Sequence, residues 1–236
     1  MSTLNPTKKV SRRQELREDK VVTFYARAWD YFDKNRAVVF GLIGTAVAVI
    51  ALIIAYGFYQ SAQQGKAQVA MARAVSAYER GEFQQSLDGT ADYDGLLSIV
   101  DNFGGTEAGN LARFYAGDAL FRLGDYDKAL KYFEDFNGDD DFIGASALAG
   151  EAAIYEMKGE NKRAGNLYLK AVDRDVHDMI STQYLLDAGR AFEAARAFDD
   201  ARDAYLSIKD NFPDSPAARS VDTYLARLYA EEGSTS

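Results

Sequence analysis

The sequence contains no cysteine and a single histidine. The lack of cysteine excludes disulfides, thiolate catalysis, thiolate metal sites and lipid attachment to an N-terminal cysteine. It also removes the residue whose usage would indicate an oxidising or a reducing compartment. One imidazole without thiolates is a poor set of metal ligands, so we expect His177, in the segment DRDVHDM, to be a solvated loop residue.

The sequence also lacks the short motifs that accompany common enzyme chemistries. It has no Gly-rich phosphate loop, no G-x-S-x-G elbow and no H-E-x-x-H pair. The run Asp139 to Asp141 lacks the alternating oxygen ligands and the closing Glu of an EF-hand, so it is better interpreted as a turn and helix N-cap. No nucleophile can be paired with a base. We therefore expect no enzymatic activity, no cofactor and no bound metal.

Charge is divided unevenly along the chain. Residues 1–36 hold nine Lys or Arg against five Asp or Glu, a net of +4, and since the whole chain carries −9, residues 37–236 carry −13. Such an acidic C-terminal part disfavours nucleic acid as a partner. Charge asymmetry on the two sides of an apolar run is an indicator of membrane topology.

The apolar run is AVVFGLIGTAVAVIALIIAYGFY, residues 37–59, which contains no charged side chain. As a helix it would extend about 34 Å, enough to cross a hydrocarbon core of about 30 Å. It is longer than a buried core helix or the apolar part of a cleavable signal peptide usually is. We predict a transmembrane helix that acts as a signal anchor, with the basic N-terminus cytoplasmic and residues 60–236 exported.

The leader before this run divides into two parts. Residues 1–20 are predicted to be a basic cytoplasmic tail, partly disordered. Residues 21–36 are predicted to form an amphipathic juxtamembrane helix that contacts membrane lipids, since its apolar and basic residues lie on neighbouring faces. The alternative is that this segment simply prolongs the transmembrane helix.

The clearest pattern of the exported part is AGDALFRLGDYDKALKYFEDF, residues 116–136. Apolar residues at helical spacing lie on both sides of Leu123-Gly124-Asp125, which predicts two helices joined by a tight glycine turn. The pattern resembles the tetratricopeptide repeat, whose small, turn and aromatic positions fall here on Gly117, Gly124, Tyr126, Ala129 and Phe133. The same pattern recurs on Ala152, Tyr155, Gly159, Ala164 and Tyr168, and then on Gly189, Phe192, Ala201, Tyr205 and Pro213.

The recurrence has a period typical of this repeat. Ala129, Ala164 and Ala201 are 35 and 37 residues apart, and Arg196 takes the place of the third turn glycine. Small residues let two helices approach closely and large ones fill the space between hairpins. The predicted fold is all-α: one N-terminal transmembrane helix, then a tetratricopeptide-like α-solenoid of about three to four helical hairpins, then a C-terminal capping helix that ends at Gly233.

The first hairpin of the array is the least regular. Ala67 to Glu82 is expected to form its first helix and residues 93–103 its second, with an irregular segment between them. The hexapeptides SIVDNF and SIKDNF, residues 98–103 and 207–212, lie 109 positions apart, which is three repeat lengths. Each is expected to end the second helix of a hairpin.

In the tetratricopeptide family, the first helices of successive hairpins line a concave groove. The matching residues here are Leu111, Phe114, Asp118, Phe121, Arg122, Met157, Leu186, Arg190 and Glu193. Such a groove suits an extended or helical peptide. For Phe114 and Phe121 the alternative is packing against neighbouring helices.

The order of charged leader, single span and exported repeat domain resembles the YfgM-like family of bacterial inner-membrane proteins, in its Bacteroidota-type form. The resemblance is carried by FDKNRAVVFGLIG, SLDGTADYDGLLSIVDNFGGTEAGNLARFYAGDAL and LGDYDKALKYFEDF. It implies a single-pass inner-membrane protein with a periplasmic domain, a chaperone-type accessory of the Sec translocon that acts with membrane-anchored chaperones on emerging polypeptides. The alternative is a structural scaffold of an envelope assembly, for cell division or outer-membrane biogenesis, without client binding.

Overall fold

The computed structural model describes residues 23, 26–27, 29–138, 141–174 and 178–233. These residues are predominantly helical, which confirms the all-α prediction. His177, Asp139 and Asp140 lie outside the described residues. Contacts divide the chain after Tyr59 into two units, and each is described by itself.

The apolar run of the first unit, residues 37–59, belongs to helix α2, Arg36–Glu79. Its most apolar window has a mean hydropathy of 2.8 and no buried side chain, which makes α2 the one candidate membrane-spanning helix of the described part of the chain. A turn at Asn35 separates α2 from the helical residues 29–34. Across this turn the ring of Phe32 packs edge-on against Phe40, with 5.7 Å between centroids.

Helix α2 is longer than either of the two helices predicted for its sequence. It runs without interruption from Arg36 to Glu79, so the expected helices at residues 37–59 and 67–82 are parts of one helix. Residues 60–66 carry no proline and only one glycine, and they propagate the helix rather than interrupt it. The helix ends before residue 82 because Gly81 adopts a positive φ of 78°.

The second unit opens with a short irregular region after α2. Helix α3, Phe83–Asp88, is followed by strands β1, Gly89–Thr90, and β2, Tyr93–Asp94, and then by α4, Leu96–Phe103. The strands pair antiparallel, with Gly89 opposite Asp94 and Thr90 opposite Tyr93. A Cβ on Gly95 would lie 2.1 Å from the Leu87 carbonyl oxygen, so the chain enters α4 at a point where only glycine fits. The segment that was expected to be irregular, residues 83–92, thus contains α3 and β1, and the helix predicted from residue 93 begins only at Leu96, after β2.

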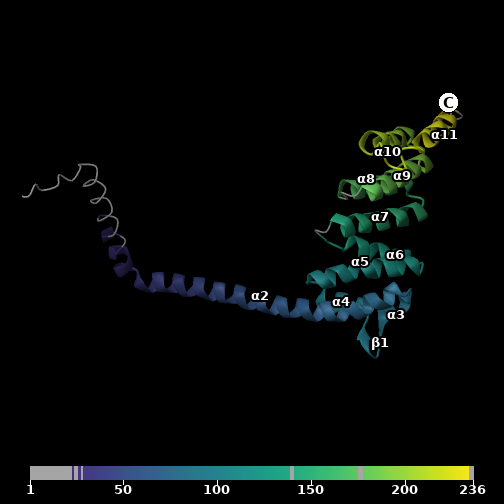
Figure 1. Cartoon of the computed structure of the whole chain (residues 1–236). Coiled ribbons are helices and arrows are strands. Elements are labelled where there is room, and N and C mark those ends of the chain that lie inside the picture. The colour runs from purple at the N-terminus through teal and green to yellow at the C-terminus, as the bar shows by residue number, and fades with distance from the viewer. Residues whose placement is uncertain (1–22, 24–25, 28, 139–140, 175–177, 234–236) are drawn as a thin grey trace, which may run out of the picture. The chain divides into compact units, whose positions relative to one another are not determined.

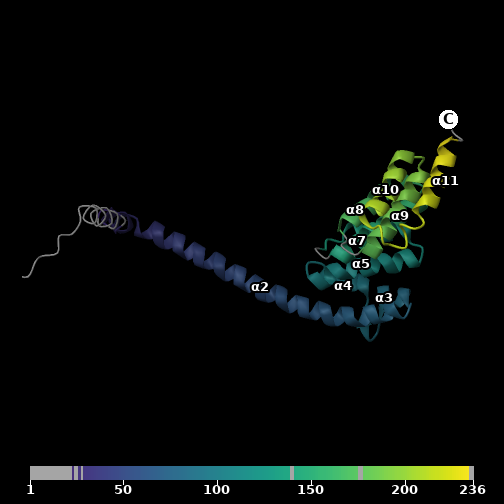
Figure 2. The ribbon, with the colours of Figure 1, turned by 45° about the horizontal axis from the view of Figure 1, so that its top comes forward.

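The remaining helices are stacked in chain order, each packed on the helix before it and the helix after it (Figures 1 and 2). They are α5, Glu107–Arg122; α6, Tyr126–Glu134; α7, Asp141–Met157; α8, Asn161–Arg174; α9, Asp178–Ala194; α10, Phe198–Asn211; and α11, Val221–Gly233. Helix α4 ends at Phe103 and α10 at Asn211, so both DNF segments end helices as predicted. Helix α11 ends at Gly233, also as predicted.

Four tight turns of the second unit share one backbone geometry. The residues Gly81, Gly124, Gly159 and Arg196 have φ values of 78°, 83°, 79° and 58°. At the second turn the Gly124 amide donates to the Phe121 carbonyl at 3.0 Å and the next amide, Asp125, donates to Leu120 at 2.9 Å. The other three turns repeat this pair of hydrogen bonds at the same offsets, which is the Schellman arrangement for ending a helix. Arg196 therefore holds a conformation that favours glycine.

The helices pack through contacts between aromatic rings and small residues. The ring of Phe133 lies between two glycines: a Cβ on Gly117 would be 3.0 Å from it and a Cβ on Gly150 would be 2.7 Å from it. A Cβ on Gly189 would lie 2.2 Å from the Tyr205 ring. The predicted packing residues that are buried are Gly117, Ala129, Phe133, Ala152, Tyr155, Ala164, Tyr168, Gly189, Phe192, Ala201 and Tyr205. Of the others, Tyr126 is half-buried and Gly124, Gly159 and Pro213 are exposed at turns.

The turn at Arg196 provides a test of the repeated geometry. A left-handed conformation costs an L-residue about 1 to 2 kcal/mol that glycine does not incur, so Arg196→Gly is expected to raise the free energy of unfolding by about 1 kcal/mol. Gly124→Ala is expected to lower it by a similar amount. Chemical denaturation of the full chain in detergent measures both.

The matched control is Gly105→Ala, since Gly105 has open space around its Cβ position and no positive φ. Its effect should stay within about 0.5 kcal/mol. A destabilised Arg196→Gly variant would contradict the shared turn geometry.

Candidate functional site

The candidate site is a surface formed by the first helix of each hairpin and by the C-terminal helix α11, here called the first-helix surface. It comprises Gln68, Met71, Val75 and Tyr78 of α2, Leu111, Phe114, Asp118, Phe121 and Arg122 of α5, Glu156 and Met157 of α7, Leu186, Arg190 and Glu193 of α9, and Arg227 of α11. Contacts between one first helix and the next recur along it. Tyr78 of α2 donates to Asp118 of α5, and Arg227 Nε of α11 donates to Glu193 of α9 at 3.3 Å.

Asp118 and Arg122 join α5 to α2. The hydroxyl of Tyr78 and the Nε of Arg122 both donate to the Asp118 carboxylate. The Arg122 guanidinium also lies over the rings of Tyr78, at 5.9 Å, and Phe83, at 5.3 Å. Burial and then the hydrogen bond to Asp118 raise the pKa of Tyr78 to about 12. These two predicted groove residues are thus engaged in an interhelical contact.

In each of two hairpins, a tyrosine of the second helix donates a hydrogen bond to a glutamate of the first helix. The Tyr168 hydroxyl donates to Glu156 at 2.7 Å, and the Tyr205 hydroxyl donates to Glu193 at 2.8 Å. Burial is the main cause that raises the pKa of both tyrosines, and the nearby glutamate adds to it. The side chain of Glu193 is only 8 % exposed and also accepts from Arg227, so it has two donors.

The remaining predicted groove residues differ in how far they reach solvent. The Phe114 ring lies 6.1 Å from Phe133 and 6.0 Å from Phe136, and the Phe121 ring lies 5.4 Å from Tyr126. Both phenylalanines therefore pack against the second helix of their own hairpin, the alternative that the sequence left open.

Three other groove residues lie further along the surface. Leu186 is half-buried, Met157 is 58 % exposed, and Arg190 donates to Asp187 at 2.6 Å while staying half-exposed. Met157 and Arg190 are therefore the predicted groove residues of α7 and α9 that solvent reaches most readily.

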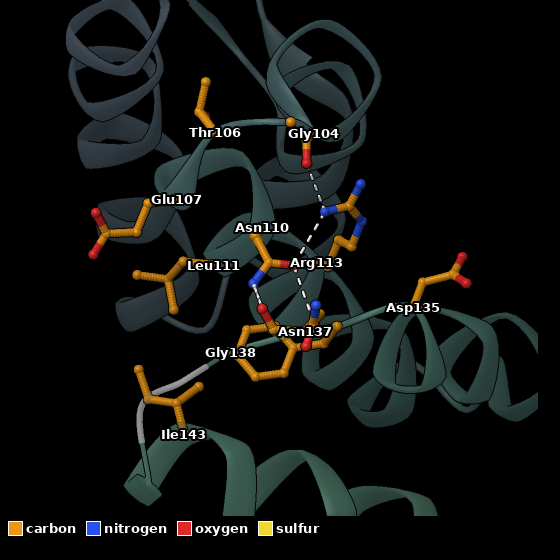
Figure 3. Close-up of a pocket in the computed structure, with 12 residues that line it drawn as sticks. Gly104, Thr106, Glu107, Asn110, Leu111, Arg113, Asp135, Asn137, Gly138 and Ile143 are labelled. Carbon is orange, nitrogen blue, oxygen red and sulfur yellow. Dashed lines mark hydrogen bonds between the residues drawn. The ribbon is translucent and has the colours of Figure 1, made fainter. Parts of the chain in front are cut away.

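A cavity of about 560 Å³ lies where the loop before α5 meets the loop after α6 (Figure 3). Arg113 donates to the Gly104 carbonyl at 2.8 Å and to Asn110 Oδ1 at 3.1 Å. Asn110 Nδ2 donates to the Asn137 carbonyl at 2.7 Å. These hydrogen bonds tie α5 to both loops, so the Arg113 and Asn110 side chains of this cavity serve the fold.

A second cavity, of about 300 Å³, lies between α2 and α5 and is here called the α2–α5 groove. Its lining residues are Gln64, Gln68, Met71, Ala72, Val75, Glu107, Ala108, Leu111 and Tyr115. The side chain of Gln64 holds the two helices together, since its Oε1 accepts from the Ala108 amide at 3.2 Å. Leu111 is the predicted groove residue that lines it.

The residues of α2 in this groove are absent from the sequence-based prediction. The first hairpin was given no repeat register, because its second helix was predicted at residues 93–103, whereas a helix already begins at Phe83. A signal was present: Gly81-Glu82-Phe83 repeats the glycine, acid and aromatic order of Gly124-Asp125-Tyr126. When Gly81 is aligned with Gly124, the residues Gln68, Met71 and Val75 align with Leu111, Phe114 and Asp118 and so fall on the first-helix surface.

A cluster of titratable groups lies where α6, α7 and α8 meet. Glu151 of α7 faces Glu134 of α6, together with Arg163 and Lys170 of α8. Burial first, and then the Glu134 carboxylate, raise the pKa of Glu151 to about 7, although the two cations act in the opposite direction. Glu134 in turn accepts from the Tyr155 hydroxyl at 3.1 Å.

A scan against protein-family models finds no match, and a search of curated proteins finds no significant similarity. Among the residues described in the structure, no group of three or more histidine or carboxylate side chains is placed to hold a metal ion. The proposed function is therefore inferred from the geometry of the first-helix surface.

Glu151 gives a pH dependence with a defined sign. Its pKa is raised from 4.5 to about 7 in the folded chain, so the folded state retains a proton that the unfolded state has lost. The free energy of unfolding should therefore fall as pH rises from about 4.5 to 7. Glu151→Gln should raise the melting temperature more at pH 8 than at pH 4.5.

The control is Asp173→Asn, which removes an exposed carboxylate of α8. Its shift in melting temperature should be small and equal at the two pH values. Equal shifts for Glu151→Gln would contradict the assignment of Glu151 as the titrating group.

Proposed function

We propose that this protein is a membrane-anchored adaptor that binds other polypeptides along the first-helix surface of an exported domain. The observation that carries the proposal is the stack itself. Four turns of one geometry return the chain, and side chains of α2 and α5, and of α9 and α11, contact each other across the row of first helices. A row of neighbouring first helices is the surface on which helical-repeat proteins hold peptides.

The second unit is proposed to be a tetratricopeptide-like solenoid. The repeat positions support this, because the small residues Gly117, Ala152 and Gly189 are all buried and the large residues Phe133, Phe192 and Tyr205 pack close to glycines. Stability in such an array comes from the contacts between hairpins, since each hairpin alone would expose an apolar face.

The apolar part of α2 is proposed to span the bacterial inner membrane, with the N-terminus in the cytoplasm and residues 60–236 in the periplasm. The charge asymmetry of the sequence supports this orientation. The resemblance to the YfgM-like family suggests the partners: the Sec translocon and membrane-anchored chaperones. An anchor of this kind raises the effective concentration of the domain near polypeptides that leave the membrane.

A second candidate function is a structural scaffold for an envelope assembly. One observation favours it: the carboxylates of Asp118 and Glu193 are held by donors from neighbouring helices rather than left available to a ligand. A surface preorganised in this way suits a single folded partner.

The proposed topology is tested by single cysteines introduced into this cysteine-free chain. Asp214, which follows α10, is suitable because it is exposed and a cysteine side chain is smaller than the aspartate it replaces. In intact cells whose outer membrane is permeabilised, Asp214→Cys should react with an impermeant maleimide and Arg27→Cys should not. Labelling of Arg27→Cys alone would indicate the opposite orientation, with the N-terminus in the periplasm. Labelling of neither or of both would contradict a single span.

The adaptor role is tested by photo-crosslinking from the exposed part of the surface. Photoreactive residues placed at Met157 and Arg190 should capture many different exported polypeptides, since both side chains reach solvent. A probe at Asp203, exposed on the second helix α10, serves as the control and should capture few. Capture of one stoichiometric protein from Met157 and Arg190 would favour the scaffold and contradict the adaptor.

A further inference from the structure

The α2–α5 groove is the part of the first-helix surface with an apolar floor. Met71, Ala72 and Val75 of α2 and Leu111 and Tyr115 of α5 line it. Met71 is buried, Val75 and Tyr115 are half-buried and Ala72 is exposed, so an apolar side chain that entered the groove would meet carbon atoms. Its volume of about 300 Å³ is large enough for one or two side chains.

The charges at the groove are acidic. Glu107 lines it at the N-terminal end of α5. The carboxylate of Glu79, at the end of α2, acts on the Tyr115 hydroxyl and adds to the effect of burial in raising the pKa of that tyrosine. Carboxylates thus lie toward both ends of an apolar floor.

Arg73 of α2 and Arg80, which follows α2, are directed to other contacts. Arg73 donates to the Asp92 carbonyl at 2.7 Å in the β hairpin, and Arg80 pairs with Glu82 at 2.7 Å. Neither of them, nor Lys66, lines the groove. The electrostatic character of the groove therefore favours a cationic partner.

We propose that the α2–α5 groove binds a segment of a partner polypeptide in which a large apolar side chain is flanked by lysine or arginine. The inference rests on the proposed adaptor function and adds to it the place of contact and the chemistry of the segment. From Gln64 to Glu79 the helix extends about 22 Å, which matches roughly six or seven residues of extended chain. Burial of the apolar side chain supplies affinity and the flanking cations supply selectivity.

The test is a binding measurement with the full chain in lipid nanodiscs and three labelled peptides. The peptide KKLFLKK carries both proposed features, EELFLEE reverses the charge and KKSGSKK lacks the apolar centre. Fluorescence anisotropy should detect the first peptide, with at least about tenfold weaker binding of the other two. Equal binding of all three would overturn the proposal.

Two variants of α2 locate the contact. Ala72→Arg places a cation in the groove at an exposed position and should weaken KKLFLKK about tenfold. The matched control is Val69→Arg, which makes a similar change at a 69 % exposed position of the same helix that does not line the groove, and it should leave affinity within about twofold. Circular dichroism of both variants checks the fold.

The outcomes separate this inference from the proposed function. If photoprobes at Met157 and Arg190 capture exported polypeptides but Ala72→Arg leaves peptide affinity unchanged, the groove assignment is wrong and the adaptor stands. If no polypeptide is captured anywhere on the surface, the adaptor itself fails. Light scattering of the wild type and of Ala72→Arg tests whether the groove binds a second copy of the chain instead. If the wild type is an oligomer and Ala72→Arg is a monomer, the groove is an interface between copies, and the proposal is overturned.

Discussion

The left-handed residue between two helices is the constraint on which the second unit depends. At Gly124 and its equivalents a positive φ ends one helix and returns the chain against it within two residues. Only then does an aromatic ring of the second helix reach a small residue of the first, as Phe133 reaches Gly117. The same ring also meets Gly150 of the next hairpin, so one contact closes a hairpin and stacks its successor.

The stacking of the helices also determines which side chains of the first helices are left to contact a partner polypeptide. Where these helices meet, polar side chains on their facing sides find partners within the chain, as Tyr78 does with Asp118 and Arg227 does with Glu193. These contacts engage the Asp118 and Glu193 carboxylates, so those two carboxylates are not left for a partner. The α2–α5 groove differs, since Met71 and Val75 leave an apolar floor there. An apolar floor beside side chains that are already held in place is what the proposed binding of a polypeptide requires.

The periodic features of the fold could be predicted from sequence, whereas the contacts between helices could not. Gly124 and Gly159 mark turns by residue type alone, and the spacing of Ala129, Ala164 and Ala201 identifies buried positions. Phe114 and Phe121 satisfy the groove pattern and the packing pattern equally, because periodicity places a residue on a face without saying what covers it. The continuity of α2 depends on residues 60–66, which have no marked periodicity, and the partner of Tyr78 depends on the register of the first hairpin, which an inserted β hairpin disguises.

The central claim is that the first helices, rather than the second helices, form the binding surface. Hydrogen–deuterium exchange of the full chain in nanodiscs, with and without an excess of a permanently unfolded polypeptide such as reduced and alkylated lactalbumin, tests it most directly. The account predicts slower exchange confined to α5, α7, α9 and the C-terminal part of α2. Protection of α6, α8 and α10 instead, or no protection in any helix, would contradict it.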